Sequence, residues 1–361
     1  MIEHDIWFSA LNLKNSTKIQ LLKKLKSTEN IWHYSRDSSL IFLNDANEIK
    51  IKNKLSNSYN TDEIGYIKRI IYKNNIKTVT CNDAHYPENL KFFDDSPCII
   101  YYKGKIENTN SNKSVAVVGS RNCSPYGKSI AASISGELSK NNVNIISGLA
   151  RGIDSAAHNS CILSNGFTCG VLGCGLDIVY PKENYKLYNE MFESGCVISE
   201  FVPGTKPNNY NFPIRNRIIS GLSDIVLIVE AVEKSGSLIT AGLALDQGKP
   251  VMAVPGSVFS DNSKGSNRLL HDGAHVFTGM QDIFELLSMN YNIVNNQKNR
   301  LLNNLQSSII NALTDKPLHI DEIINITHID IKQLYELLFE LQLDNQILCL
   351  SGNFYVKVAA D

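Results

Sequence analysis

The chain has 361 residues, and its 35 Lys and Arg almost balance its 36 Asp and Glu, which gives a formal net charge of -1. Hydrophobic residues make up 43% of the sequence, enough for a sizeable core, and this excludes a largely disordered chain. Because the net charge is near zero, a surface that is polycationic throughout is also excluded, and any nucleic-acid partner must be held by a local cluster of cations.

Residues 1–75 are predicted to form a helical domain. Five apolar residues recur there at spacings that place them on one helix face. The segment is rich in lysine, and residues 1–110 carry 16 Lys and Arg against 13 Asp and Glu. The five apolar residues are Leu11, Leu13, Ile19, Leu22 and Leu25.

Residues 76–287 have the pattern of an α/β domain. Apolar runs at 76–80 and 97–102 predict two strands, and five more short runs follow, several of them beside glycine. Such runs are typical of buried parallel strands, and the helical segments between them predict a doubly wound sheet that binds ligands outside the carboxyl ends of its strands. The five later runs are 115–118, 143–146, 169–172, 225–229 and 251–254.

The last part of the chain is predicted to be a polar linker, residues 288–300, followed by a separate domain, residues 301–361. Three helical segments and two short strands around a Ser-Gly-Asn turn predict a winged helix there. Residues 291–361 hold five Lys or Arg against eight Asp or Glu. Duplex DNA binding needs several cations, so we expect this domain to bind a protein.

The turn Gly119-Ser120-Arg121 follows the strand at 115–118 and precedes a helix. Backbone N–H groups at such a turn can bind an anion, and the Arg121 guanidinium can grip a phosphate with two hydrogen bonds. The G-x-G-x-x-G pattern is absent and no acidic residue closes the next strand, so NAD binding is not expected. A tight turn with a solvated arginine is the alternative.

A second candidate helix, predicted within residues 212–222, carries Arg215 and Arg217 in its first turns. Cations are disfavoured at that end of a helix, so a bound anion would explain their presence. A structural ion pair with Asp224 or Glu200 is the alternative. Pro213 fits the first helical position, and we expect a buried stripe at i, i+4 and i+8. The stripe consists of Ile214, Ile218 and Leu222.

Three further features lie where the strands of this sheet are expected to end. Lys182 follows Tyr180-Pro181, although a single lysine is most often a solvated surface residue, and Lys206 precedes Pro207 near the same entrance. Ser235, Gly236 and Ser237 open a helix whose small residues suit a phosphate, although the lysine of a Walker loop is missing.

Asp154 and His158, which lie near Arg151, could be mistaken for a catalytic set. No nucleophile accompanies them, so we expect Asp154 to cap a helix and His158 to have a structural role.

Several classes of protein are not expected from this sequence. It has no run of about 18 apolar residues and no signal-peptide pattern at its start. Its eight cysteines contain no C-x-x-C pair and no zinc spacing. We expect a cytoplasmic protein with reduced thiols, no metal, no cofactor and no membrane segment.

The ordered motifs VAVVGSRNCSPYG, SGLARGIDSAAH, FPIRNRIISGLSD and SGSLITAGLALDQGK resemble those of the DprA (DNA-processing, Smf) family. The resemblance covers about residues 76–285. It implies an extended Rossmann-like parallel sheet, preceded by a helical SAM- or helix-hairpin-helix-like domain and followed by a winged helix.

The resemblance also implies a function. Family members bind and protect incoming single-stranded DNA and promote RecA loading during transformation and recombination, without catalysis, and they form homodimers, here through about residues 240–280. Tyr180, Tyr210 and Phe212 are candidates to stack a base. The DNA-binding residues implied are Gly119, Ser120, Arg121, Lys182, Lys206, Arg215 and Arg217, with Ser235, Gly236 and Ser237 as a possible phosphate site.

Two other functions compete with this one. A Rossmann-like nucleotide phosphoribohydrolase would have a related fold, but its PGGxGTxxE signature is absent, and SGSLITA stands in its place. A scaffold that acts only through its winged helix would not need cations at the loops of residues 119–217. In the helical domain, the stretch 13–18 lacks the glycine of a DNA-binding hairpin, so direct DNA contact there is not predicted.

Overall fold

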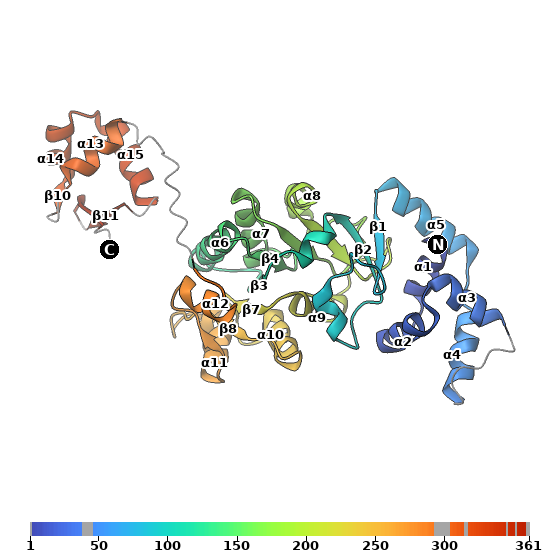
Figure 1. The fold of residues 1–361 in the computed structure, drawn as a ribbon. Coiled ribbons are helices and arrows are strands. Elements are labelled where there is room, and N and C mark those ends of the chain that lie inside the picture. The colour runs from blue at the N-terminus through green and yellow to red at the C-terminus, as the bar shows by residue number, and fades with distance from the viewer. Residues whose placement is uncertain are drawn as a thin grey trace. The chain divides into compact units, whose positions relative to one another are not determined.

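The computed structural model describes residues 2–37, 46–291, 304–313, 317–343, 346–350 and 352–358 (Figure 1). The chain divides into two compact units, Met1–Asn292 and Ile293–Asp361. Most of the predicted linker, from residue 292 on, lies outside the described residues, so its bounds stay a prediction.

The first unit begins with five helices, whose apolar faces pack on one another and on the sheet. Leu22 and Ile31 lie in one core with Ile99 and Tyr101 of the sheet. The Tyr101 hydroxyl lies 2.5 Å from Ser9 Oγ, so a hydrogen bond joins helices and sheet as well. The helices are α1 Ile2–Ala10, α2 Asn15–Leu25, α3 Thr28–Arg36, α4 Ala46–Ser56 and α5 Thr61–Lys73.

The predicted apolar helix face is wrong for two of its residues. Leu11 and Leu13 lie in the turn between α1 and α2, because Lys14 is extended and α2 begins only at Asn15. Leu11 is still buried in the core of this layer, so its apolar character reflects packing and not helical periodicity.

The described residues form one nine-stranded sheet in this unit, in the order β1-β2-β6-β5-β4-β3-β7-β8-β9. The seven strands from β6 to β9 are parallel, whereas β2 runs antiparallel to β6 and β1 antiparallel to β2. The strands are β1 Lys77–Thr80, β2 Ile99–Gly104, β3 Ser114–Val118, β4 Asn144–Ser147, β5 Thr168–Val171, β6 Cys196–Ser199, β7 Ile225–Ile228, β8 Val251–Ala253 and β9 His275–Val276.

Helices cover both faces of the parallel part, as the doubly wound prediction requires (Figure 1). Side chains alternate along a strand, so Val115 and Val117 of β3 pack with α6 Pro125–Lys140, α7 Ile153–Leu163 and α12 Met280–Leu286. Ala116 and Val118 face the opposite side, where α9 and α10 lie. The remaining elements are α8 Tyr185–Ser194, α9 Asn211–Leu222, α10 Gly236–Asp246, α11 Lys264–His271 and the 3-10 helices η1 Glu88–Phe92, η2 Ile106–Asn110, η3 Lys182–Asn184 and η4 Asp261–Ser263.

Helix α9 differs from its prediction in start and in orientation. It begins at Asn211, so Pro213 is its third residue, and Ile214 is 45% exposed. The buried stripe runs from Asn211 through Arg215 and Ile218 to Leu222. Arg215 takes the inward position because backbone carbonyls receive its guanidinium there.

The second unit has the predicted winged-helix elements. Ile323 and Leu334, from two of its helices, pack with Ile347 and Tyr355 of its three-stranded sheet, which has the order β10-β12-β11. The elements are α13 Asn304–Ala312, β10 Leu318–His319, α14 Ile320–Thr327, α15 Ile331–Leu343, β11 Ile347–Leu350 and β12 Phe354–Lys357.

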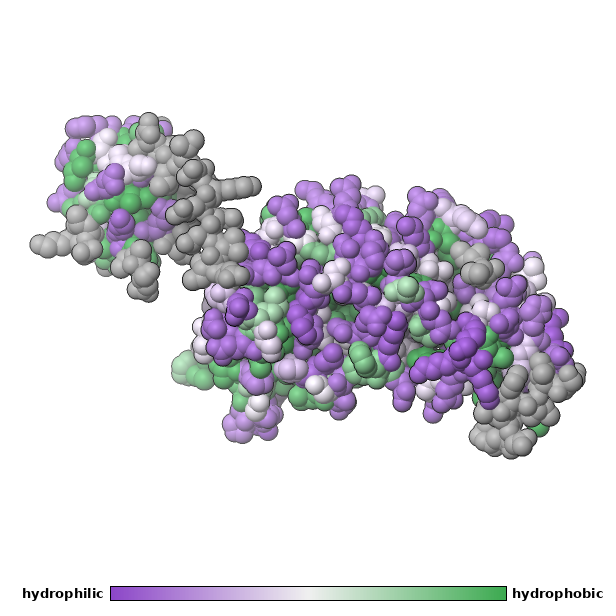
Figure 2. Space-filling view, in the orientation of Figure 1, coloured by the Kyte–Doolittle hydropathy of each residue, from purple (hydrophilic) through white to green (hydrophobic). Residues whose placement is uncertain are grey.

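Hydrophilic residues cover most of the visible face of the first unit (Figure 2). Within the described ranges, no helix combines the length and the apolar composition needed to cross a bilayer.

Candidate nucleic-acid interface

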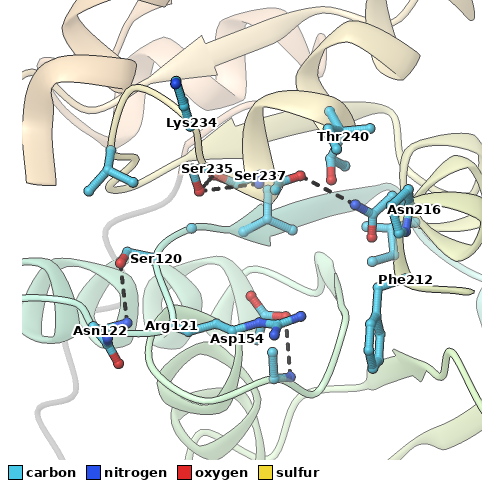
Figure 3. Close-up of a pocket in the computed structure, with 18 of the residues that line it drawn as sticks. Ser120, Arg121, Asn122, Asp154, Phe212, Asn216, Lys234, Ser235, Ser237 and Thr240 are labelled. Carbon is cyan, nitrogen blue, oxygen red and sulfur yellow. Dashed lines mark hydrogen bonds between the residues drawn. The ribbon is translucent and has the colours of Figure 1, made fainter. Parts of the chain in front are cut away.

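A pocket of about 790 Å³ lies at the carboxyl ends of β3 and β7. These two strands are neighbours in the sheet, but the chain continues from β3 to β4 on one side and from β7 to β8 on the other. This is the topological switch point, where doubly wound sheets bind ligands. The residues after β3 form one wall and the start of α10 forms the other (Figure 3).

The turn after β3 is held in place by close backbone contacts. Ser120 donates its N–H to the carbonyl of Glu230 at 2.8 Å, and its Oγ accepts from the N–H of Asn122 at 3.2 Å. Gly119 is required, because a Cβ there would lie 2.7 Å from Ile153 Cγ1. This fixed turn leaves the side chain of Arg121 exposed at the pocket.

Arg121 lies beside an aromatic surface. Its Cζ is 5.1 Å from the centre of the Phe212 ring, and Tyr180 stacks on the same ring at 5.5 Å with an interplanar angle of 27°. These residues also line a smaller cavity of about 80 Å³ next to the pocket. A cation beside stacked rings can hold a phosphate while a base stacks nearby.

The opposite wall is the start of α10. Ser235 caps this helix, its Oγ accepting from the N–H of Ser237 at 3.3 Å and lying 2.7 Å from Ser237 Oγ. Asn216 of α9 donates to the carbonyl of Gly236 at 3.4 Å. Lys234, exposed beside the cap, adds a cation to the positive end of the helix dipole. The predicted site residues Gly119, Ser120, Arg121, Arg215, Ser235, Gly236 and Ser237 all line this pocket.

Arg215 supplies a buried positive charge below the pocket. Its Nη1 donates to the carbonyl of Gly148 at 2.7 Å and to that of Val171. A side chain on Gly148 would displace this guanidinium, since a Cβ would lie 2.3 Å from Nη1. Burial lowers the pKa of Arg215 to about 10, so the guanidinium remains charged at neutral pH.

Asp154 and His158 have structural partners. The Asp154 carboxylate accepts from the N–H groups of Gly148 at 3.1 Å and Ala150 at 3.3 Å, and burial raises its pKa. The prediction that it caps its helix is wrong, because Gly152 is the N-cap. The structural role predicted for His158 is confirmed: Nδ1 lies 2.6 Å from Thr168 Oγ1, and burial lowers the pKa to about 3.

Three predicted cations lie outside this pocket. Arg217 is buried and its Nη2 lies 2.5 Å from Glu200 Oε2, which matches the structural ion pair considered as the alternative. Lys182 and Lys206 are exposed, do not line the pocket, and make no ion pair among the described residues. Their contact with DNA stays a prediction.

Sequence reasoning missed several residues that line the pocket, among them Asn122, Lys234 and Asn262. Lys234 could have been found as a cation just before the Ser235 helix cap. In the part of the chain that the structure describes, no three His, Cys, Asp or Glu side chains gather as metal ligands.

Comparisons with known proteins find matches to both units of the chain. Residues 77–288 match the family described as DNA recombination-mediator protein A, and residues 296–353 match the DprA winged helix domain. DNA processing protein DprA from Bacillus subtilis is 41% identical over 212 residues, which are 59% of this chain and 71% of that protein.

Two solved structures are also similar. DNA processing protein A from Streptococcus pneumoniae aligns with a TM-score of 0.67 at 30% identity, over 81% of this chain and 99% of that one. The protein of the same name from Helicobacter pylori, whose structure addresses its single-stranded DNA binding mode, aligns with a TM-score of 0.55 at 31% identity, over 60% of this chain and 97% of that one.

Proposed function

The chain belongs to the DNA recombination-mediator protein A (DprA/Smf) family, and we propose that it binds single-stranded DNA in the pocket at the topological switch point. The observation that carries this proposal is the exposed Arg121 beside the Phe212 ring, across the pocket from the start of α10. The relative from Helicobacter pylori, with its single-stranded DNA binding mode, supports the same class of ligand.

The binding mode that fits these residues is electrostatic capture with little sequence preference. A phosphate lies between Arg121 and the N-terminus of α10, with Lys234 at the rim and the buried charge of Arg215 below. A base stacks on Phe212 or Tyr180. Stacking of this kind needs a base that is free of a duplex, so single strands are preferred over double strands. Lys182 and Lys206 bind further phosphates of the strand outside the pocket.

We also propose the rest of the family's role for this chain: it protects the strand, loads RecA on it, acts in the cytoplasm as a homodimer, and catalyses no reaction. The exposed apolar side chains of Leu245 and Val276 support a dimer contact within residues 240–280. A non-catalytic role is supported by Asp154, the acidic residue of the pocket, whose carboxylate is bound to two backbone N–H groups.

The test compares fluorescein-labelled single-stranded and duplex oligonucleotides by fluorescence anisotropy at two salt concentrations. Wild type should prefer the single strand, and Arg121→Ala should weaken binding and reduce the slope of log K against log salt by about 0.7, the share of one phosphate contact. Equal affinity for duplex, or an Arg121→Ala variant with unchanged affinity and slope, would contradict the proposal.

A further inference from the structure

A second cavity of about 540 Å³ lies beside the first. It is lined by Ser124 and Tyr126 at the start of α6, by Glu230 after β7, and by residues of the 255–263 loop. Asn122 and Asn262 line the first pocket, and the Asn262 side chain donates to the carbonyl of Asn122 at 3.3 Å. The two cavities therefore share a rim built from the same two chain segments.

Ser263 contributes a hydroxyl to the lining of this cavity. Ser263 is the N-cap residue of α11 and is only 5% exposed, yet its side chain makes no capping hydrogen bond. Among the described residues, no partner of its Oγ is found. A Cβ on Gly256 would lie 2.1 Å from this Oγ, so the glycine leaves the hydroxyl open to the cavity. Because this hydroxyl reaches the cavity, it can form a hydrogen bond with a ligand that lies there.

The wall around Gly256 is rigidly built. The Asn267 side chain accepts from the Gly256 N–H at 3.1 Å and donates to the Gly256 carbonyl at 2.9 Å. The loop that carries Gly256 is thus fastened to α11, whose N-cap is Ser263. These hydrogen bonds therefore fix the shape of this side of the cavity.

This cavity differs from the first pocket in the charge of its lining. Its lining contains no Lys or Arg, and it contains the buried carboxylate of Glu230, which accepts from the Ser124 N–H at 2.8 Å and from Ser124 Oγ at 2.5 Å. A phosphate is disfavoured near a carboxylate when no Lys or Arg of the lining offsets the negative charge. Tyr126, which is 54% exposed, offers a flat aromatic face. A neutral, flat group that forms hydrogen bonds fits this lining.

We propose that the second cavity binds a nucleobase of the strand whose phosphate occupies the first pocket, an inference that rests on the proposed function. Tyr126 stacks on the base and the Ser263 hydroxyl bonds to its edge. Because a serine hydroxyl can donate or accept, this contact suits every base, in keeping with binding that is independent of sequence.

The test compares the affinity for an oligothymidylate with that for an abasic strand of the same length, which keeps the phosphates but lacks the bases. Tyr126→Ala should weaken oligothymidylate binding about tenfold, leave abasic binding unchanged, and leave the salt slope at its wild-type value. Ser263→Ala, which removes one hydroxyl from the cavity, should act in the same direction with a smaller effect. Tyr72→Ala is the matched control, since Tyr72 is 63% exposed and lies on α5, away from both cavities.

The outcomes separate this inference from the proposed function. Failure of wild type to bind single-stranded DNA would overturn both. Binding that depends on Arg121 but is unchanged in Tyr126→Ala and Ser263→Ala, or an equal loss on the abasic strand, would overturn only the base site. Thymidine alone should not saturate wild type at micromolar concentration. If it did, the cavity would be a site for free nucleosides and the assignment to a base of the strand would be wrong.

Discussion

Arg215 is the residue whose replacement tests the architecture of the pocket most severely. Arg215→Met keeps the length and apolar stem of the side chain but removes the hydrogen bonds to Gly148 and Val171. Hydrogen bonds from a charged group contribute about 1.5–3 kcal/mol each, and breaking a buried charge network costs about 3–5 kcal/mol. We expect the free energy of unfolding of the first unit to fall by about 3–5 kcal/mol at pH 8.

The loss should depend on pH through Asp154. Burial raises the pKa of this carboxyl, and the charge of Arg215 opposes that rise. Without Arg215 the pKa in the folded state rises further, so the folded protein binds a proton that the unfolded chain, with a pKa near 3.9, has already released. The free energy of unfolding of the variant therefore falls as pH increases from the unfolded pKa to the folded pKa of Asp154, a wider range than in wild type. The cost of Arg215→Met should therefore be smaller at pH 5 than at pH 8.

Urea unfolding followed by tryptophan fluorescence measures this effect, because both tryptophans, Trp7 and Trp32, lie in the first unit. Arg151→Met is the control, since Arg151 is exposed and pairs with an exposed glutamate, and its midpoint should be unchanged. A loss below about 1 kcal/mol for Arg215→Met, or an equal loss at both pH values, would refute the reasoning about the buried charge.

Three further predictions follow from the geometry. Gly148→Ala should destabilise the first unit by about 1–3 kcal/mol in the same urea assay, because its Cβ meets Arg215 Nη1 at 2.3 Å; wild-type stability would disprove the tight fit. His158, whose pKa is lowered to about 3, should not titrate between pH 5 and 8 by NMR, and its contribution should make stability fall as pH drops below 6.5. Lys182→Ala/Lys206→Ala should weaken single-strand binding and reduce the salt slope by up to about 1.4, whereas an unchanged slope would remove both lysines from the DNA track.

The sheet could be predicted from the sequence because its central strands are buried on both faces. Runs such as Val115–Val118 read as continuous apolar segments beside glycine, which separates them from helices. Strand β6 was missed, because only one residue separates its start at Cys196 from the end of α8 at Ser194. Strand order, and with it the switch point between β3 and β7, depends on contacts that no local pattern contains.

The candidate site was predictable in part for a similar reason. Arg121 could be found because a strand, a glycine turn and a helix follow one another in the sequence. Arg215 and Arg217 were grouped together, but residues two apart on an α-helix point about 200° apart, so both could not face one pocket. Only the fold shows that Arg217 turns toward Glu200. The second cavity was not predictable, since its walls come from residues 124–126, 230 and 255–263.

The central claim is that single-stranded DNA lies in the switch-point pocket. Photo-crosslinking the full chain to a single strand that contains 5-iodouracil, followed by mass spectrometry of the peptides, tests it directly. The account predicts crosslinks to Phe212 or Tyr180, reduced in the Arg121→Ala variant. Crosslinks confined to the second unit, Ile293–Asp361, or unchanged at Phe212 in that variant, would contradict it.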